Sequence, residues 1–425
     1  MMTRTIACVV AASAAMWSGC REVRGPLSTP IPPWKDYSRP LPPGQWALRK
    51  ITDPAEIPDF TSALATTAGL REAIARSLNY LSKPSSKAWY ARGYGGITHA
   101  EAVATLKAFD AMLASGASPA EMNRCIRQTY DVYVSVGCDD RGTVLFTSYY
   151  TPVFAAARKQ THALRYPLYR KPDDLVKTET GQVLGRKGPD GRIIGPYPTR
   201  REIETSGMLV GKELFWLADP FEVYIAHVQG SARLRLPDGK LVTVGYTATN
   251  GHEYKSIAKM MVDDGKIPRD RLSLRAMIDY FKAHPQEVDG YVLRNPRYVF
   301  FAEEPGMPRG CLNEPVTPMR TIATDKEIYP PACLAFLATR VPRRLGSEVV
   351  VEPYTGFALD QDAGGAILAP GRCDLYRGIG DEAGELAGRT YEEGRLYYLF
   401  LRPPGQPPPQ TAMIGVEAHV RPAPR

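Results

Sequence analysis

Histidine and cysteine are few in this sequence, and neither occurs in a metal-binding pattern. Its 425 residues contain 6 histidines, without a His-x-x-x-His pair, and 7 cysteines, without a Cys-x-x-Cys pair. The spacings typical of zinc sites and of thioredoxin-like redox centres are therefore missing. An odd number of cysteines follows Cys20, so at least one thiol is unpaired, or paired with another chain, in an oxidising compartment. We expect no metal and no cofactor.

A run of basic residues is also missing. The net charge is +8, but lysines and arginines are scattered along the chain. This pattern argues against a nucleic-acid partner and suits an acidic polymer only weakly. No segment after residue 20 is long and apolar enough to cross a membrane. The length and the ordinary composition predict a globular protein of two domains.

The N-terminus carries the longest apolar run. Arg4 is followed by a run that includes IACVVAASAAMW, too short to span a bilayer comfortably, and then by SGC ending at Cys20. This order is typical of a secretory signal peptide, predicted over 1–19. The small residues before Cys20 resemble the cleavage box of bacterial lipoproteins, with Trp17 as a departure. We expect a periplasmic protein anchored to the outer membrane by lipid on Cys20; export without lipid is the alternative.

The pattern after the signal peptide changes from proline-rich to helical. Residues 20–45 predict an extended spacer, and the proline-rich residues 403–425 predict a tail. An apolar stripe from Leu70 predicts one helix. Thr98 and Ser118 each begin a capping box, the two-way hydrogen bonding of a helix start, and predict two more.

From about residue 144 the sequence becomes rich in β-strand patterns. Alternating apolar residues flank Asp238-Gly239, which predicts a β-hairpin with its turn at that dipeptide. Helical patterns interrupt the strands before residue 300, and short strands return in the last third. The expected fold class is therefore mainly β with N-terminal helices (α+β).

Two aspartates twelve positions apart are the first candidates for chemistry. Asp362 and Asp374 flank a glycine- and proline-bearing segment, DAGGAILAPGRCD. Paired carboxylates suit acid–base work on a glycosidic bond, because burial and like charge both raise the pKa of an aspartic acid. The structural alternative is that Asp362 caps a turn and Asp374 binds backbone.

Two other activities suggested by this region do not hold. GIGDEA, residues 378–383, matches a dinucleotide-binding loop, but Asp381 and Glu382 would repel a pyrophosphate at the start of the following helix. An aspartic protease would need two Asp-[Ser/Thr]-Gly loops, and DAGG is a single approximate copy. We therefore exclude both.

Polar residues elsewhere could bind sugar hydroxyls. FTSYYTPVF supplies one group at the boundary between helical and β regions, HVQGSARLRLPDG a second at a strand end, and TNGHEY a third before a helix. The candidates for substrate binding are Thr147, Tyr150, Gln229, Ser231, Asn250 and His252. Among these six residues, His252 is the one for which a structural role is most strongly favoured.

Taken together, these segments resemble the MltA family of membrane-bound lytic murein transglycosylases. The stretches FTSYYTPV, YPTRREIE, HVQGSARLRLPDG, VGYTATNGHEYKSI, NPRYVFF and DAGGAILAPGRCDLYRGIGDEAGELAGR stand in the family's order over roughly residues 145–400. None of the departures from the family pattern removes a carboxylate; they are Ser148, Ala232 and Ala369.

The resemblance implies a fold and its domain boundaries. A double-psi β-barrel domain would be built from 46–150 and 305–402, with the N-terminal helices packed on it. A second, smaller β domain would be inserted over 151–304. The long groove of the family would lie between them, next to Asp362 and Asp374.

The resemblance also implies a reaction on peptidoglycan. Asp374 would protonate the oxygen between N-acetylmuramic acid and N-acetylglucosamine, and then accept the proton of the muramic C6 hydroxyl, leaving a 1,6-anhydro ring. Asp362 would support it. The sequence leaves two alternatives: a peptidoglycan hydrolase that uses the aspartate pair, or a murein-binding lipoprotein without turnover. Proteins of cell-wall synthesis or remodelling are possible partners.

Overall fold

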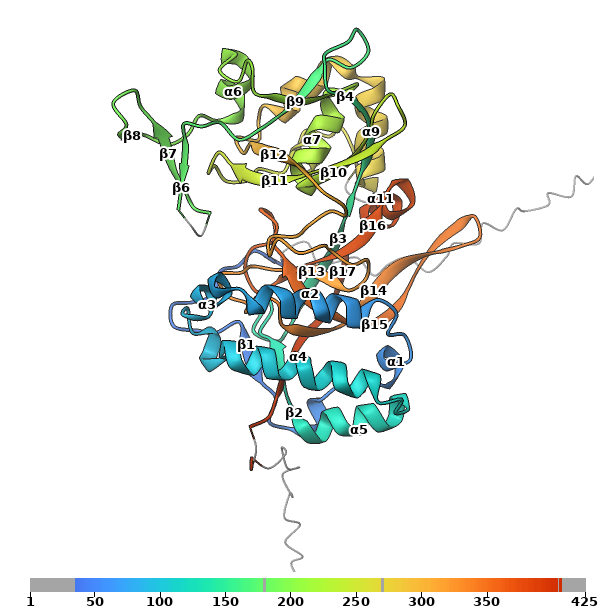
Figure 1. Ribbon diagram of the computed structural model, residues 1–425. Helices are drawn as coiled ribbons and strands as arrows, with labels where there is room; N and C mark the ends of the chain where they lie inside the picture. The colour runs from blue at the N-terminus through green and yellow to red at the C-terminus, as the bar shows by residue number, and fades with distance from the viewer. Residues whose placement is uncertain (1–34, 179–180, 269–270, 404, 407–425) are drawn as a thin grey trace, which may run out of the picture. The chain divides into compact units, whose positions relative to one another are not determined.

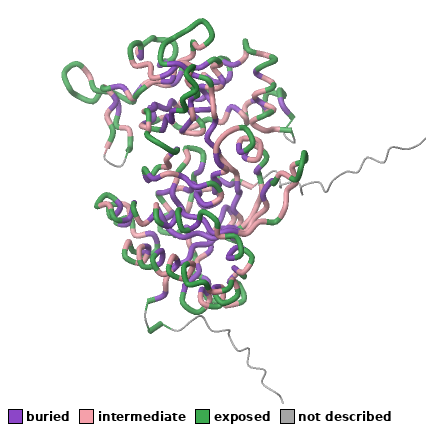
Figure 2. The backbone as a smooth tube through the Cα atoms, turned by 45° about the vertical axis from the view of Figure 1, so that its right-hand side comes forward, coloured by how far each residue is buried: buried purple, intermediate pink, exposed green. Residues whose placement is uncertain are grey.

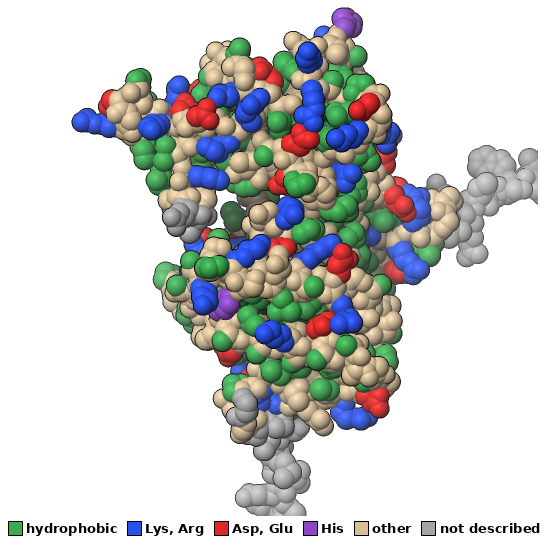
Figure 3. All heavy atoms as spheres, viewed as in Figure 1, with side chains coloured by type: hydrophobic (Ala, Val, Ile, Leu, Met, Phe, Trp, Pro, Cys, Tyr) green, Lys and Arg blue, Asp and Glu red, His purple; other side chains and the backbone are tan. Residues whose placement is uncertain are grey.

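The computed structural model describes residues 35–178, 181–268, 271–403 and 405–406 (Figure 1). The predicted signal peptide, Cys20, most of the spacer and most of the tail lie outside the described residues. Within the described part, no helix is both long and apolar enough to cross a membrane. Lys and Arg side chains are interspersed with Asp and Glu over the face seen in Figure 3, as their scatter along the sequence predicts.

The N-terminal region is helical, as the sequence predicts. Both predicted capping boxes form, at Thr98 with Glu101 and at Ser118 with Glu121. The helices pack on the barrel core, where Phe60 meets Phe336 at a centroid distance of 4.8 Å. The helices are α1 (Thr61–Leu64), α2 (Leu70–Ser82), α3 (Pro84–Tyr90), α4 (His99–Ala114) and α5 (Pro119–Thr129).

Six strands pair in a closed ring and form a β-barrel. Around the ring they are β3 (Val144–Thr151), β16 (Arg372–Ile379), β13 (Thr321–Ala323), β15 (Glu348–Asp362), β14 (Leu334–Leu345) and β17 (Glu392–Leu401). β3 runs parallel to β16, and β13 parallel to β15; the other neighbours in the ring are antiparallel. β2 (Tyr130–Ser135) pairs with β17, and β1 (Leu48–Lys50) with β2.

A second, six-stranded sheet is built from the middle of the chain. Its strands are β12 (Val299–Glu304), β11 (Leu241–Thr249), β10 (Ser231–Arg235), β4 (Val153–Ala157), β9 (Glu213–Leu217) and β5 (Tyr166–Tyr169), in that spatial order. The predicted hairpin is confirmed: β10 and β11 are antiparallel, and Gly239 in their turn has a φ of 83°. Figure 2 shows buried residues gathered in the interior and exposed residues mainly at the periphery.

Short helices and one small sheet complete this middle region. A three-stranded sheet contains β6 (Leu175–Lys177), β7 (Val183–Lys187) and β8 (Ile193–Ile194). The helices are α6 (Arg200–Ser206), α7 (Pro220–Gln229), α8 (Ile257–Asp263), α9 (Leu274–Ala283) and α10 (Val288–Val292). After β16, α11 (Asp381–Gly388) begins with the acidic pair that excludes a pyrophosphate.

Candidate active site

Asp374 lies on β16, on the face of the strand that turns away from the apolar core. Its neighbours Cys373 and Leu375 are buried in that core, whereas Asp374 is partly exposed. Asp374 is in register with Ala323 of β13 on one side and with Thr147 of β3 on the other. Because laterally paired residues point to the same face of a sheet, Thr147 and Asp374 lie next to each other.

Burial dominates the electrostatics of Asp374. It raises the pKa of this carboxyl from 3.8 to about 6, although the Arg372 guanidinium and the Thr147 hydroxyl favour the ionised form. The negative charge of Asp362 raises the pKa further. Oδ1 of Asp374 is buried and has no hydrogen-bond partner among the described residues. The group can therefore hold a proton near neutral pH and release it without first breaking a hydrogen bond at Oδ1.

A β-bulge brings Asp362 onto the same face as Asp374. On β15, Asp360 is in register with Ile322, but the next residue of β13, Ala323, is in register with Asp362. The extra residue reverses the alternation of side chains, because a slip of one position exchanges the two faces. Asp360 consequently points inward, where it is fully buried and binds Lys326 and the Tyr398 hydroxyl.

Three hydrogen bonds hold the Asp362 carboxylate in place. The Tyr149 hydroxyl donates to Oδ2 at 2.7 Å, and the backbone N–H groups of Cys311 and Ala363 donate to Oδ1 at 2.9 and 2.8 Å. A Cβ on Gly310 would lie 2.7 Å from the Gln361 carbonyl oxygen, so only glycine lets this loop come so close. Burial raises the pKa of Asp362, and these hydrogen bonds oppose the rise. Asp362 is thus fixed, whereas Asp374 has an oxygen free.

Ser231 joins the second sheet to this face of the barrel. Its hydroxyl lies 3.3 Å from that of Thr151, which lies 3.0 Å from the Tyr376 hydroxyl. The Tyr376 ring is 5.1 Å from the ring of Tyr149, the partner of Asp362. A continuous chain of side chains therefore connects Ser231 to the aspartates.

Tyr150 and Gln229 are placed differently. Tyr150 is 6% exposed and packs against α11, where a Cβ on Gly384 would lie 2.7 Å from its ring. The Gln229 side-chain oxygen accepts a hydrogen bond from the Tyr150 backbone N–H at 3.1 Å. These two residues hold β3 against α11 and α7.

Asn250 and His252 follow β11 and bind backbone groups. The Asn250 amide donates to the carbonyls of Pro198 and Pro296 and accepts from the N–H of Tyr298. His252 Nε2 lies 2.7 Å from the Tyr197 carbonyl oxygen. The structure shows no contact between either side chain and Asp374.

Three residues of the site are not in the predicted set, although the stretch FTSYYTPVF that suggested Thr147 and Tyr150 also contains Tyr149. Tyr149 and Arg372 share the face of Asp374, each two positions along a strand from Thr147 or from Asp374. Arg297 lies at the loop after Asp362, because a Cβ on Gly365 would be 3.0 Å from its guanidinium. Side chains alternate between the two faces of a strand, so Tyr149 and Arg372 could have been predicted from their two-residue spacing to Thr147 and Asp374. The sequence around Arg297, NPRYVFF, contains no comparable signal.

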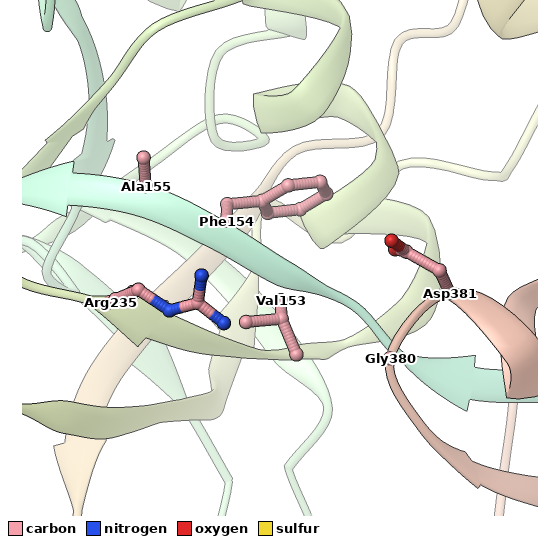
Figure 4. Close-up of a pocket in the computed structure, with 6 residues that line it drawn as sticks. All are labelled: Val153, Phe154, Ala155, Arg235, Gly380 and Asp381. Atoms are coloured by element: carbon pink, nitrogen blue, oxygen red, sulfur yellow. The ribbon is translucent and has the colours of Figure 1, made fainter. Parts of the chain in front are cut away.

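A separate cavity of about 260 Å³ opens between β4, β10 and the start of α11 (Figure 4). Its lining includes the charged side chains of Arg235 and Asp381. None of the residues predicted to bind substrate lines it. We assign no role to this cavity.

Comparisons with known proteins agree with the fold. The family model "MltA specific insert domain" matches residues 145–302, and the "3D domain" model matches residues 320–400. The Escherichia coli K12 membrane-bound lytic murein transglycosylase A is 30% identical over 277 residues, which are 64% of this chain and 70% of that protein. The Vibrio cholerae protein of the same name is 29% identical and covers 62% of this chain and 67% of its own length.

Solved structures show the same architecture. The crystal structure of a membrane-bound lytic murein transglycosylase from Agrobacterium tumefaciens aligns with a TM-score of 0.69 at 27% identity, covering 84% of this chain and 98% of that one. Escherichia coli MltA with bound chitohexaose aligns with a TM-score of 0.61 at 25% identity, covering 87% and 97%. The expected fold class, a double-psi β-barrel with a second, smaller β domain, is confirmed. The chain belongs to the MltA family of membrane-bound lytic murein transglycosylases.

Proposed function

We propose that this protein is a lytic transglycosylase that cuts peptidoglycan between N-acetylmuramic acid and N-acetylglucosamine without water, with Asp374 as the single acid and base. Its relatives are lytic murein transglycosylases, and one of them binds chitohexaose in its crystal structure. The observation that carries the mechanism is the placement of Asp374 beside Thr147 on a partly exposed face, with an Oδ1 that has no hydrogen-bond partner among the described residues. Burial, which raises the pKa of Asp374 to about 6, supports this role.

The reaction needs one proton that leaves and returns. Protonated Asp374 donates to the glycosidic oxygen as its bond to C1 of the muramic acid breaks. The C6 hydroxyl of the same sugar then attacks C1, and its proton passes to the Asp374 carboxylate. The new C6–O–C1 bond closes the 1,6-anhydro ring, and the enzyme is restored. Because the nucleophile is tethered to the sugar, its effective concentration reaches about 10⁵ M or more.

The contacts of Asp362 favour this mechanism over a hydrolase with two working carboxylates. An inverting hydrolase needs a second carboxylate that can activate water. Both oxygens of Asp362 already accept hydrogen bonds from Tyr149, Cys311 and Ala363. We therefore propose that Asp362 positions Tyr149 and the loop around it, and adds negative charge near Asp374.

The polar residues divide into two proposed roles. Thr147 contacts the reacting sugars, because it lies next to Asp374 on the partly exposed face. Ser231 lines the approach from the second sheet. The remaining predicted binding residues support the glycan path indirectly, since their polar groups or rings are engaged in the protein: Tyr150, Gln229, Asn250 and His252.

We further propose the domain boundaries and the cellular location. The barrel strands lie within 46–150 and 305–402, apart from the last residue of β3, and the strands of the second sheet lie within 151–304. The relatives are membrane-bound, which supports a lipoprotein on the periplasmic side of the outer membrane, anchored at Cys20. Wall-synthesis or remodelling proteins are proposed as partners.

Digestion of purified sacculi tests the proposed function. The wild-type protein should release soluble muropeptides with 1,6-anhydro ends, and Asp374→Asn should reduce the rate by about 10²-fold to 10⁴-fold, as expected for loss of a general acid. Equal release by both proteins would contradict the role of Asp374. Binding to sacculi without release by the wild type would identify a murein-binding protein instead.

A further inference from the structure

A second cavity, of about 320 Å³, lies on the polar face of the inserted sheet. On β10, Ala232 and Leu234 are buried in the apolar core of this domain, so Arg233 points to the opposite face. Arg233 is in register with Thr243 of β11, and Thr243 with Glu304 of β12. These three residues all line the cavity.

The two charged groups in this row are not paired with each other. Nε of Arg233 and Oε2 of Glu304 are buried, and neither has a hydrogen-bond partner among the described residues. Two strand spacings, about 10 Å, separate their backbones. The neighbouring Glu303 is different, because it already forms an ion pair with Arg158 at 2.8 Å. Both side chains are half-buried: Nη1 of Arg233 donates to Sδ of Met307 at 3.8 Å, and the charge of Arg309 favours the ionised form of Glu304. The buried Nε and Oε2 atoms still lack partners, which a ligand in the cavity would supply.

The sheet leaves room for the Glu304 carboxylate at Gly245. A Cβ on Gly245 would lie 2.3 Å from Cδ of Glu304, so the carboxylate lies directly over this glycine. The backbone of Gly245 is not in the left-handed region. A glycine at this position therefore matters because it leaves space for the Glu304 carboxylate. It is in register with Ser231, so the carboxylate lies beside the strand that carries Arg233.

The cavity adjoins the aspartate site. Ser231 connects through Thr151 to the Tyr376 hydroxyl, and Tyr376 follows Asp374 by two positions on the same face of β16. Burial raises the pKa of Tyr376, and Arg233 is close enough for its charge to oppose this rise. A glycan whose scissile bond lies at Asp374 could therefore place a substituent of the muramic acid in this cavity.

We propose that Arg233 and Glu304 bind the stem peptide of peptidoglycan, Arg233 through a peptide carboxylate and Glu304 through the ammonium group of a diamino acid. The inference rests on the proposed function, since the peptide arrives on the glycan that Asp374 cuts. A stem peptide carries both a carboxylate and an ammonium group and so complements Arg233 and Glu304 together. Neutral sugars carry neither charge. The enzyme then prefers peptide-bearing strands to the same strands without peptides.

The ratio of kcat/KM for the two kinds of strand tests this proposal. Glycan strands with stem peptides, and the same strands after amidase treatment, are digested by each variant, and anhydro ends are counted. The wild type should favour peptide-bearing strands by about tenfold or more, the factor expected for contacts to charged groups. Arg233→Gln and Glu304→Gln should each bring the ratio close to one. Gly245→Ala should do the same, because its Cβ displaces the Glu304 carboxylate without removing a charge.

The matched control is Arg235→Gln, which removes the same charge from the same strand but lies outside this cavity. It should keep the wild-type ratio, and thermal unfolding checks that all variants fold. A second measurement is calorimetric binding of the free stem tripeptide, with a diamino acid as its third residue, to the Asp374→Asn protein. Binding should be lost in the double variant with Arg233→Gln.

The outcomes separate this proposal from the proposed function. A wild-type ratio near one, or variants that keep the wild-type ratio, would overturn the peptide site and leave the transglycosylase intact. No anhydro product from either substrate would overturn the proposed function, and the peptide site with it.

Discussion

Asp362 and Asp374 are in register with the same residue, Ala323, one on each side of strand β13. Two strand spacings, about 10 Å, therefore separate their backbones. The surroundings give the two carboxyl groups different roles: Asp362 accepts three hydrogen bonds, whereas Oδ1 of Asp374 accepts none from the described residues. Asp362 is held by hydrogen bonds at both oxygens, whereas Asp374 keeps one oxygen without a partner among the described residues.

Asp362→Asn should lower activity without abolishing it. Asparagine keeps one oxygen for the N–H groups of Cys311 and Ala363, while its NH₂ group faces the Tyr149 hydroxyl, which must turn to accept. We expect kcat to fall about tenfold and stability to fall by about 1–3 kcal/mol, as for a disturbed buried hydrogen bond. Steady-state digestion and urea unfolding measure the two effects. A loss as complete as that of Asp374→Asn would mean that both carboxylates take part in bond cleavage.

Stability should depend on pH through Asp374. Its pKa is about 6 in the folded protein, against an ordinary 3.8, so the folded state holds this proton more tightly than the unfolded state does. The resulting stabilisation is complete below pH 4 and is lost as the pH rises through 6. A difference of about two pKa units corresponds to roughly 3 kcal/mol.

The Asp374→Asn variant is the matched reference for this pH dependence, because it removes the Asp374 titration and keeps every other titrating group. Between pH 4 and pH 7, the free energy of unfolding of the wild type should fall by roughly 3 kcal/mol relative to this variant. A difference that stays constant over this range would show that the pKa of Asp374 is ordinary. The catalytic rate of the wild type should also decline above pH 6, because less of the acid is protonated.

Two substitutions of Tyr150 distinguish a structural role of its ring from a substrate-binding role of its hydroxyl. Its ring packs on Gly384, Ala383 and Ala387 of α11. Tyr150→Phe should keep both activity and stability, whereas Tyr150→Ala should lower stability by about 3–5 kcal/mol, the usual effect of removing a buried aromatic ring. Denaturant unfolding and sacculus digestion measure these effects. A stable Tyr150→Phe protein with little activity would show that the hydroxyl binds glycan.

Local features of the fold could be predicted from the sequence. The capping boxes at Thr98 and Ser118 and the Asp238-Gly239 hairpin depend on residues a few positions apart. The mainly β class with N-terminal helices also followed from local patterns. The double-psi β-barrel followed from the family's motifs instead, because pairing of β3 with β16 joins strands more than two hundred residues apart.

The candidate site could be predicted only in part. Asp374 and Thr147 are neighbours on one face, but the bulge that turns Asp362 to this face has no signature in the sequence. Tyr150 was predicted to bind substrate, whereas its neighbour Tyr149 shares the face of Thr147 and binds Asp362. Adjacent strand residues point to opposite faces, and only the paired strands show which face meets the aspartates.

The most direct test of the mechanism is digestion of peptidoglycan in water enriched in oxygen-18, followed by mass spectrometry of the new ends. If the muramic C6 hydroxyl attacks C1 while Asp374 carries the proton, the products are anhydro ends that are one water lighter than reducing ends and contain no label. Reducing ends that carry oxygen-18 would show that water is the nucleophile, and would contradict the account.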